Sequence, residues 1–422
     1  AKRHEKMEPH DPVYTMEDAD GIIARIVPCH YDAVIDLCEG IKIRFTDIGH
    51  LLGSSSIEVW MDEEGQKRKI VFSGDIGNKN QPLIKDPKLT QEADYVVMES
   101  TYGNRVHSMD KPDYVTELAG ILSDTFAKGG NVVIPSFAVG RTQEMLYFLR
   151  KIKADRLVED FPDFPVYVDS PRAVEATGIF NKNIYNCFDE EAMELVRQGI
   201  NPLQFPGLHL AITSDESIMI NFDETPKVIL SASGMCDAGR VRHHLKHNLW
   251  RAECTILFVG YQAVGTLGRI IVDGTDEVKL FGETISVRAR IAKLAGMSGH
   301  ADKNGLLEWI GGFVQKPQRV FVVHGEDSIC EEFRDCLERE YGFTARAPYS
   351  GTCYDLLTNT CEYAAKPVPV KKRRKAGDIF DRLLAAGQRL LGIIRKNEGG
   401  TNKDLAKFAD QINSLCDKWD RV

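Results

Sequence analysis

Histidine and acidic residues follow five apolar segments of the sequence, at the point where each segment ends. They are His50 in DIGHLLGS, Asp75 in FSGDIG, Glu99 in VVMESTYGN, His300 in MSGHAD and His324 in VVHGE. Imidazole nitrogens and carboxylate oxygens brought from several strands to one sheet edge are the ligands that a zinc-type site requires. An aspartate there can bridge two metal ions, and a histidine outside the coordination sphere can protonate a leaving group. Together the five residues predict a metal site with an acid–base group beside it.

The segment AKLAGMSGHADKNGLLEWIG (292–311) shows why no single residue is enough. Taken alone, this strand-to-helix corner is explained by Ser298 or Asp302 capping the helix and by a solvated His300. A buried histidine satisfied by the backbone is the matching alternative for each of the other imidazoles. It is the repetition of acid or imidazole groups at five strand ends that favours a shared site.

Five segments share one pattern, in which a β-branched apolar run is followed by a small or polar corner and then by an amphipathic run. They cover residues 131–149, 164–180, 227–245, 292–311 and 319–337. This alternation predicts α/β architecture with mostly parallel strands, whose carboxyl ends meet at one edge. Earlier, residues 42–62 and 68–77 have the pattern of adjacent strands separated by the polar turn DEEGQ, which predicts an antiparallel arrangement.

Length and composition predict a cytoplasmic protein of two domains with an appendage. The chain has 422 residues, 43% of them hydrophobic and 27% charged, and it shows neither an apolar run long enough to cross a bilayer nor a secretory leader. Its ten cysteines are scattered without a Cys-x-x-Cys pair, which favours reduced, mostly buried thiols. The net charge of −9 argues against a globally basic nucleic-acid coat and leaves a local basic groove open.

The five motifs quoted first, in this order, resemble those of the β-CASP branch of the metallo-β-lactamase superfamily. SFAVGRTQE, SASGM and GYQAVGTLGR resemble that branch's inserted domain. The resemblance implies an α/β fold in which an N-terminally incomplete metallo-β-lactamase domain of the αββα type is interrupted by a parallel α/β β-CASP domain. The expected parts are residues 1–105 and 287–365 for the metallo-β-lactamase domain, 106–286 for the β-CASP domain, and 366–422 for a basic linker and amphipathic helical tail.

The resemblance also implies an activity, namely a metal-dependent ribonuclease that hydrolyses single-stranded RNA with a two-metal-activated water. His50 and His324 resemble the histidine ligands of the first and second metal, and Asp75 resembles the aspartate that bridges them. Glu99 resembles the acidic residue that orients an imidazole, and His300 resembles that imidazole, the general acid for the leaving 3′ oxygen. The implied cofactors are two Zn²⁺ ions, with Mn²⁺ open because imidazole and carboxylate suit both metals.

The family's His-x-His-x-Asp-His motif is absent. No two of the eleven histidines are separated by one residue. In relatives this motif lies upstream of a segment resembling the first forty residues, so we expect the chain to be a fragment that begins inside the first half of the metallo-β-lactamase domain. A catalytic zinc normally has three protein ligands. We therefore expect a substoichiometric zinc content in this chain, because each lost ligand weakens binding.

Three corners have residue types suited to holding RNA phosphates. Ser136 and Arg141 in SFAVGR follow a strand and precede a helix, and Ser233 and Gly234 repeat the arrangement with Arg240 beyond them. A third corner carries Arg269. The alternative is that the glycines serve tight turns and that the arginines pair with surface carboxylates; it is stronger for Arg240 and Arg269 than for Ser136 and Arg141.

The segment RVRHHLKHNL (240–249) places His243 and His247 one helical turn apart, a spacing that can bind zinc. A basic, solvated helix face is the first interpretation, an RNA-facing surface the second and a further metal site the third, since no carboxylate or cysteine lies obviously alongside.

The pattern changes after about residue 365. A basic block at 371–375 predicts an exposed linker, and apolar residues with helical spacing in 379–394 and 405–419 predict two amphipathic helices. Such helices must dock on the body, on a second copy or on a partner, and we favour a homo-oligomer.

A non-catalytic RNA-binding or assembly subunit of the same fold is the alternative function. Inactive relatives typically lose several motif residues, whereas every motif downstream of residue 40 is intact here. Hydrolysis of a small ester or lactam is disfavoured, because the large insert and its Ser/Arg corners suit a long polyanion.

Overall fold

The computed structural model describes residues 14–107, 112–294 and 296–368, and beyond them 387, 390–391, 393–397 and 402–419. The chain forms two compact units, Ala1–Ala365 and Lys366–Val422. The larger unit contains two α/β layers built on separate sheets, one of seven strands and one of six.

The first sheet is mixed, and its strands lie in the order β1-β2-β3-β4-β5-β14-β15. Strands β1 to β4 form an antiparallel meander, while β4, β5, β14 and β15 are parallel neighbours. The antiparallel arrangement predicted for residues 42–62 and 68–77 is confirmed. The strands are Val34–Cys38 (β1), Ile41–Asp47 (β2), Ser55–Glu63 (β3), Gln66–Phe72 (β4), Tyr95–Met98 (β5), Arg319–Val322 (β14) and Ala345–Arg346 (β15).

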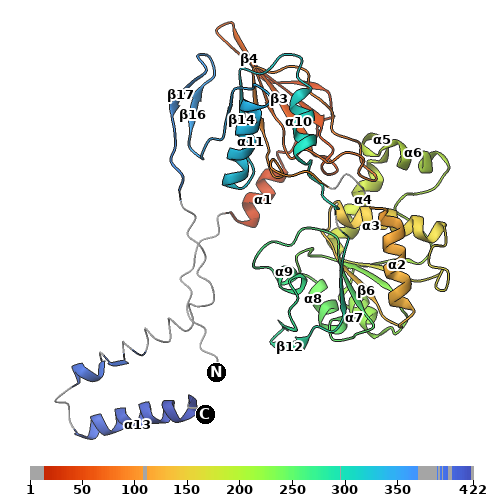
Figure 1. Cartoon of the computed structure of the whole chain (residues 1–422), viewed down its shortest axis with the longest axis vertical. Helices are drawn as coiled ribbons and strands as arrows, with labels where there is room; N and C mark the ends of the chain where they lie inside the picture. Colours follow the sequence, from red (N-terminus) through yellow and green to blue (C-terminus); the bar gives the residue numbers. More distant parts are fainter. Residues whose placement is uncertain are drawn as a thin grey trace. The chain divides into compact units, whose positions relative to one another are not determined.

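Helices α10 (Lys303–Gly311) and α11 (Asp327–Arg339) cover one face of this sheet (Figure 1). Alternate strand residues such as Val96 and Val322 point to that face, where they pack against Trp309 and other apolar helix residues. The opposite face presents Tyr95 and other apolar side chains, which pack against residues of the hairpin β16 (Cys353–Asp355) and β17 (Thr360–Tyr363) and the segment that joins its strands.

The second sheet is entirely parallel, in the order β13-β10-β6-β9-β7-β8. Its short β-branched and leucine-rich runs, such as VVIP and VILS, are fully buried, which is typical of parallel strands covered on both faces. The parallel α/β domain predicted in the middle of the chain is therefore confirmed. The strands are Val132–Pro135 (β6), Val166–Asp169 (β7), Leu208–Ala211 (β8), Val228–Ser231 (β9), Thr255–Phe258 (β10) and Arg290–Lys293 (β13).

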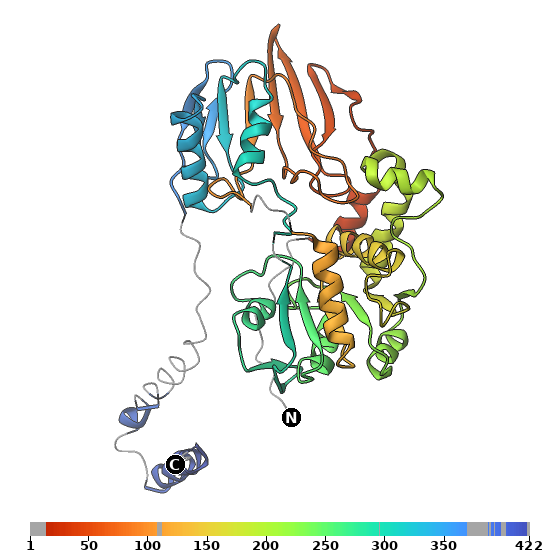
Figure 2. The same ribbon diagram turned by 45° about the vertical axis from the view of Figure 1, so that its right-hand side comes forward.

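Two groups of helices cover the faces of the second sheet (Figures 1 and 2). One face carries α2 (Tyr114–Phe126), α3 (Arg141–Ala154), α4 (Pro171–Lys182), α5 (Ile184–Cys187) and α6 (Glu190–Arg197). The other carries α7 (Ser214–Phe222), α8 (Val241–Asn248), α9 (Leu267–Val272) and the hairpin of β11 (Glu277–Leu280) and β12 (Glu283–Ser286). Because β13 pairs with β10, this sheet extends past the boundary predicted at residue 286, and the division into domains stays a prediction.

The corner that carries His300 joins the two sheets along the chain. It leaves β13 of the six-stranded sheet and enters α10, which packs on the seven-stranded sheet. Asp302 caps α10 by accepting a hydrogen bond from the backbone N–H of Gly305, so the predicted cap is present. The capped helix fixes His300 two residues upstream.

The smaller unit contains α13 (Asn402–Trp419), which matches the second predicted tail helix. The basic block 371–375 and most of the first predicted tail helix lie outside the described residues. No helix among the described residues is long and apolar enough to span a membrane. All ten cysteines are free, and four of them (Cys187, Cys236, Cys254 and Cys336) are buried, so the expectation of mostly buried thiols is wrong.

Candidate metal centre

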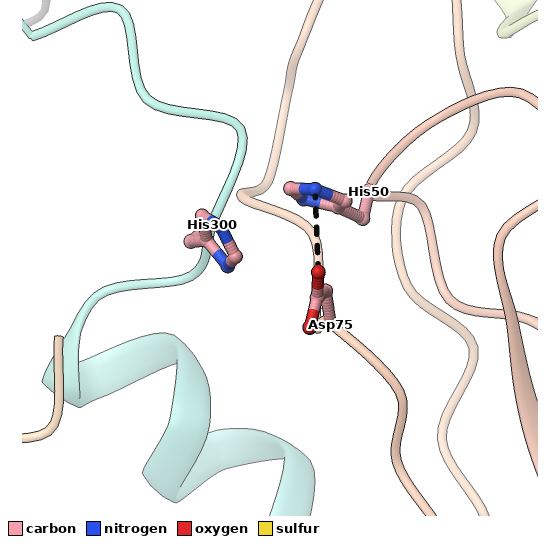
Figure 3. A group of neighbouring side chains, drawn as sticks. All are labelled: His50, Asp75 and His300. Carbon is pink, nitrogen blue, oxygen red and sulfur yellow. Dashed lines mark ion pairs between the residues drawn. The ribbon is translucent and has the colours of Figure 1, made fainter. Parts of the chain in front are cut away.

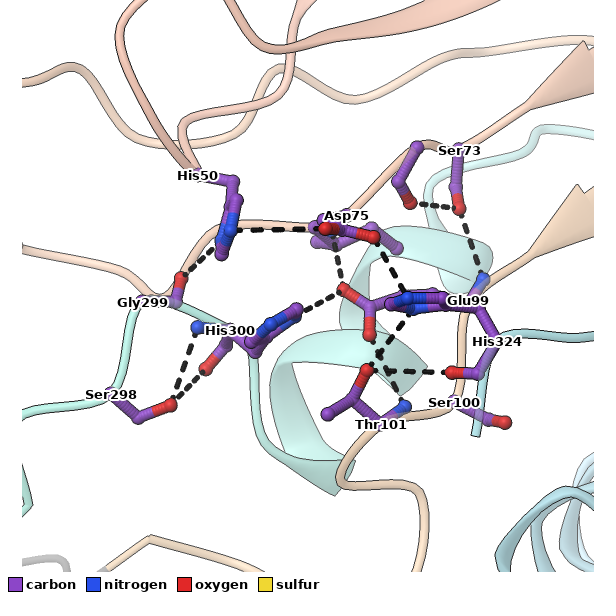
Figure 4. A network of polar contacts seen from close by, with 12 residues as sticks. His50, Ser73, Asp75, Glu99, Ser100, Thr101, Ser298, Gly299, His300 and His324 are labelled. Carbon is purple, nitrogen blue, oxygen red and sulfur yellow. Dashed lines mark hydrogen bonds and ion pairs between the residues drawn. The ribbon is translucent and has the colours of Figure 1, made fainter. Parts of the chain in front are cut away.

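The five side chains singled out in the sequence come together at one place in the larger unit (Figure 4). Asp75 lies between two imidazoles: its Oδ2 is 3.8 Å from Nε2 of His50, and its Oδ1 is 3.3 Å from Nδ1 of His324. Nδ1 of His300 lies 3.2 Å from Oε1 of Glu99. Loops after β2, β4, β5, β13 and β14 supply these groups, so residues 274 positions apart in sequence (50 and 324) share one cluster.

His50, Asp75 and His300 each offer a ligand atom within 4.8 Å of the others, which is close enough to surround one cation (Figure 3). Nδ1 of His50 lies 3.1 Å from the carbonyl oxygen of Gly299. A carbonyl can only accept, so Nδ1 carries the proton and the lone pair of Nε2 faces Asp75. A backbone carbonyl that fixes the tautomer in this way is the usual support of a metal-binding histidine. The donor set therefore fits a metal ion.

Three of the loops lie close together because their backbones contact one another directly. Gly77 pairs with His300 in an isolated antiparallel bridge, and the N–H of Asn78 donates to the carbonyl of Gly299. A side chain on Gly77 would place its Cβ 2.0 Å from the carbonyl oxygen of Gly49. Only glycine allows the loops that carry His50, Asp75 and His300 to approach this closely.

Gln81 holds the same three loops together and was not identified from the sequence. This residue is almost fully buried, and its Nε2 lies 3.2 Å from the carbonyl oxygens of Gly49 and Gly299 and 3.1 Å from that of Asn78. An amide group can serve several acceptors at once, whereas nothing in the segment GNKNQPL distinguishes this glutamine from a solvated one.

Glu99 is buried and fully engaged. Oε1 accepts hydrogen bonds from the N–H of Ile76 and from Nδ1 of His300, and Oε2 accepts one from the N–H of Thr101. Burial alone would raise the pKa of Glu99, but the hydrogen bonds and the charge of His300 outweigh burial and lower it. Glu99 is therefore a carboxylate that orients His300.

The rings of His300 and His50 are tilted by 43° with centroids 4.3 Å apart, yet the pKa values of the two residues shift in opposite directions. Burial opposes protonation of His300, but the hydrogen bond to Glu99 and the charges of Glu99 and Asp75 prevail and raise its pKa. Burial and the neighbouring His300 lower the pKa of His50. One imidazole thus favours carrying a proton, as an acid needs, and the other favours the neutral form, as a metal ligand needs.

His324 is the most exposed member of the cluster, at 58%. Its backbone has a φ of 50°, a left-handed conformation that histidine tolerates better than most residues. Oγ1 of Thr101 lies 3.3 Å from its Nδ1. Thr101 follows Glu99 by two residues, so the ESTYG segment contacts both His300 and His324, a role that was missed in the sequence.

The predicted phosphate corner at Ser136 and Arg141 is close to the cluster, but its side chains are occupied. Oγ of Ser136 is buried and bonds to Oγ1 of Thr142. Arg141 pairs with Glu144 and donates from Nη2 to the carbonyl of Met297 at 2.7 Å. Arg141 therefore ties the first turn of α3 to the loop that leads to His300.

The corner at Ser233–Gly234 contacts the segment GYQAVGTLGR, which carries Arg269: Nε2 of Gln262 in that segment donates to the carbonyl of Gly234. Oγ of Ser233 donates to the carbonyl of Ala238 within its own corner. Arg269 donates from Nε to both carboxylate oxygens of Asp273, one helical turn away. The alternative that arginines in these corners pair with carboxylates thus describes the observed contacts of Arg269.

Arg240 pairs with a carboxylate as well, at a buried position. Its Nη1 lies 2.7 Å from Oδ1 of Asp169, and Oδ2 of the same residue lies 2.6 Å from Nε2 of His244. His244 is fully buried, so the interpretation of α8 as a solvated face is wrong for this histidine. His243 and His247 are exposed, and no metal-binding group among the described residues includes them.

A cavity of about 980 Å³ opens beside the cluster, between the His300 loop and the helices of the six-stranded sheet. Ser298 and Asp302 line it from the His300 side, and Arg141 and Lys151 line it from α3. Lys79 and Lys85, from the loop after Asp75, add positive charge, while Glu144 and the acidic start of α6 add negative charge. Residues from the loops of both α/β layers therefore line an open cavity next to the candidate metal ligands, with apolar side chains among the charged ones.

Two family descriptions match the chain. Residues 142–271 match the Beta-Casp domain, and residues 284–348 match the Zn-dependent metallo-hydrolase RNA specificity domain. The first range lies in the six-stranded sheet and its helices. The second range contains His300 and His324.

Relatives extend the similarity over most of the chain. It is 36% identical to ribonuclease TTHA0252 of Thermus thermophilus over 317 residues, which are 75% of this chain and 70% of that relative. It is 33% identical to an RNase J-like protein of Methanocaldococcus jannaschii, over 80% of this chain and 76% of the relative. Transcription termination factor FttA of the same organism is 31% identical over 79% of this chain, which spans only about half, 53%, of that relative's length. The chain therefore belongs to the β-CASP family of the metallo-β-lactamase superfamily.

Proposed function

We propose that the protein is a metal-dependent ribonuclease that hydrolyses phosphodiester bonds of single-stranded RNA. The observation that carries this proposal is the meeting of five side chains from five separate loops: His50 and His324 lie beside Asp75, and His300 lies beside Glu99. Relatives named as a ribonuclease and as an RNase J-like protein support RNA as the substrate class.

The residues proposed to hold metal are His50, Asp75 and His324, with Asp75 between the two histidines. When bound, the metal, proposed as two Zn²⁺ ions with Mn²⁺ as the alternative, would supply a Lewis acid for the phosphoryl group and would lower the pKa of a water molecule. His50 presents the lone pair of Nε2 toward Asp75, and the lowered pKa of His50 keeps this imidazole neutral. Zinc content below two per chain remains our expectation.

His300 is proposed as the general acid. Its Nδ1 is committed to Glu99, so Nε2 carries the proton that can move to the leaving 3′ oxygen of the cut strand. The raised pKa of His300 favours the protonated form of this ring. Glu99 holds the ring and compensates its charge, and Asp75 adds a second negative charge nearby.

The path of the RNA is proposed to run through the cavity beside the His300 loop. Lys85 and Lys151 supply positive charge along its walls, together with Lys79 and Arg141, which pair with Glu308 and Glu144. Carboxylates of the same walls, such as Asp302 and those at the start of α6, would have to face away from the phosphates. Corners at Ser136, Ser233, Gly234 and Arg269 are proposed as further phosphate contacts, made by backbone groups where the side chains are already bonded. A cytoplasmic location and self-association through the tail helices complete the proposal; free thiols throughout the chain support the first.

A cleavage assay with His300→Ala tests the reaction. Because this chain alone is expected to hold an incomplete metal site, the complete protein is incubated with end-labelled single-stranded RNA and Zn²⁺ or Mn²⁺, and bound metal is measured by mass spectrometry. We expect His300→Ala to lower turnover about 100-fold or more with nearly unchanged metal content. His247→Ala, which removes an exposed histidine of α8, is the matched control and should change neither.

Two outcomes would contradict the proposal in different ways. Loss of metal in proportion to activity would place His300 among the ligands, which its position within 4.8 Å of His50 and Asp75 allows. RNA binding by the complete protein with no product in either metal would favour the alternative, a non-catalytic RNA-binding or assembly subunit.

A further inference from the structure

The loop that follows Glu99 is fastened to the corner that carries His300. The N–H of His107 donates to Oδ2 of Asp302 at 2.9 Å, and Nε2 of His107 lies 3.2 Å from the carbonyl oxygen of His300. The N–H of Lys303 donates to the carbonyl of Arg105 at 2.9 Å. These three contacts, all made by residues 105 and 107 of the loop, hold the loop in a fixed position beside His300.

Tyr102 lies between this loop and the cluster. Its ring is nearly perpendicular to that of His300, with centroids 6.0 Å apart at 85°, and to that of His107, at 5.1 Å and 78°. The guanidinium carbon of Arg105 lies 4.0 Å from the ring centroid of Tyr102, over the face of the ring. A cation over an aromatic face is attracted by the ring quadrupole, so Tyr102 holds the Arg105 side chain one ring away from His300.

Arg105 differs from the other arginines of these corners. Arg141 pairs with Glu144, Arg240 with Asp169 and Arg269 with Asp273. Arg105 is exposed, and no carboxylate of the described residues pairs with it. A guanidinium is always charged and carries five N–H donors in a planar fork. Its charge and donors therefore face solvent beside the candidate metal centre.

We propose that Arg105, seated on Tyr102, binds a backbone phosphate of the RNA next to the phosphate that is cut. The inference rests on the proposed function and names one contact of that substrate. The fork matches two phosphate oxygens, and stacking on Tyr102 reduces the side-chain entropy that phosphate binding would cost. Tyr102 is then a positioning residue, because it acts on the RNA through Arg105.

The test measures binding apart from cleavage. The full chain is titrated into fluorescein-labelled single-stranded RNA in EDTA, and anisotropy is recorded from about 50 to about 300 mM salt. Each phosphate contact to a single strand contributes about 0.7 to the slope of log K against log salt. We expect Arg105→Ala to weaken binding about tenfold and to reduce that slope by about 0.7, uniformly across RNA sequences.

Matched variants separate the contact from general charge. Arg339→Ala removes the same charge at the end of α11, where the side chain is 80% exposed, and should leave affinity and slope close to those of the unaltered chain. Arg105→Lys keeps the charge and should keep the slope while weakening binding. Tyr102→Phe keeps the ring and should bind normally, whereas Tyr102→Leu should weaken binding when Arg105 is present and not when it is already alanine.

Each result decides between the inference and the function on which it rests. If the unaltered chain does not bind RNA, both fall together. If it binds RNA and Arg105→Ala behaves like Arg339→Ala, only the Arg105 contact is overturned. Weaker binding with an unchanged slope would also overturn it, because the lost contact would not be to a phosphate. Arg105 is exposed, so thermal melting of the variants should match that of the unaltered chain.

Discussion

Nδ1 of His300 donates a hydrogen bond to Oε1 of Glu99 across 3.2 Å, and the same carboxylate oxygen accepts the N–H of Ile76. The pair resembles the histidine–carboxylate couples that fix an imidazole for proton transfer, because it leaves Nε2 free and places a negative charge behind the ring. Glu99 is 2% exposed, so water screens this charge poorly. Glu99 therefore raises the pKa of His300 more than Asp75 does.

Glu99→Gln tests that dependence while keeping a hydrogen-bond acceptor of the same size. Burial lowers the pKa of His300, and the hydrogen bond and charge of Glu99 raise it, so removal of that charge should lower the pKa. A general acid acts in its protonated form. We therefore expect the alkaline limb of the pH–rate profile to move to lower pH, with turnover at neutral pH reduced about tenfold or more. Initial rates from about pH 5 to about pH 9 measure both effects.

The matched control for this prediction is Glu144→Gln, at the carboxylate that pairs with Arg141 rather than with an imidazole. It should leave the alkaline limb where it is. An alkaline limb that does not move in Glu99→Gln would show that His300 is not the acid whose ionisation limits the rate.

The approach of Gly77 to Gly49 gives a second prediction, on folding. A Cβ at residue 77 would meet the carbonyl oxygen of Gly49 at 2.0 Å, so Gly77→Ala must push apart the loops that carry His50 and Asp75. We expect a loss of about 2 to 3 kcal/mol of stability, together with weaker metal binding. Urea unfolding and metal titration provide the two measurements.

Gly120→Ala is the opposite control. Gly120 is exposed in the middle of α2, and a Cβ added there would have no atom within 4 Å beyond its own helix and chain neighbours. Alanine should stabilise that helix by about 0.5 to 1 kcal/mol. If both substitutions changed stability equally, the close approach at Gly77 would not be the cause.

Much of this architecture follows from sequence patterns that depend on local physics. Buried parallel strands read as short β-branched runs, and the runs at 132–135, 228–231 and 319–322 all form such strands. Which sheet a strand joins, in contrast, does not follow from its local sequence. Arg290–Lys293 ends a strand pattern like the others, yet it joins the six-stranded sheet while the helix after it packs on the seven-stranded one. The sheet that this strand joins is decided by pairing with strands far away in the sequence, and a single sequence does not show which strands pair.

In the candidate site, too, some features could be predicted from the sequence and others could not. The repetition of ionisable residues after five apolar segments identifies the members of the cluster, although each residue alone has an ordinary structural explanation. Gln81 was missed because its role consists of three contacts to backbone carbonyls of distant loops. Arg141 was identified as a residue at a useful corner, but its pairing with Glu144 and its contact with Met297 depend on the packing of α3. Sequence shows which groups are available and the fold decides which are already bonded.

A second buried carboxylate, Glu58, lies on the seven-stranded sheet away from the candidate metal residues. Oε1 accepts from Nε of Arg44 at 2.7 Å and from Oγ1 of Thr46 at 3.2 Å, and Oε2 lies 2.7 Å from Nζ of Lys69. Both cations also lie over the ring of Trp60. Glu58 is 1% exposed, so removal of its charge would leave Arg44 and Lys69 without compensation in a partly buried network.

Glu58→Gln should therefore destabilise the protein by about 2 to 3 kcal/mol at neutral pH. Burial raises the pKa of Glu58, but its bonds to Arg44 and Lys69 outweigh burial and lower the pKa below the unfolded value of about 4.3. The stabilisation is thus fully present above the unfolded pKa and is lost as the pH falls through the folded pKa. The difference in free energy of unfolding between the unaltered protein and Glu58→Gln should therefore shrink below about pH 4.

Urea unfolding at about pH 7, 4 and 3 measures that difference. The control is Glu283→Gln, at an exposed pair with Lys246, which should cost less than about 0.5 kcal/mol throughout. A difference that stays constant down to about pH 3 would mean that Glu58 is not stabilised as a carboxylate, and that the network holds the sheet by packing alone.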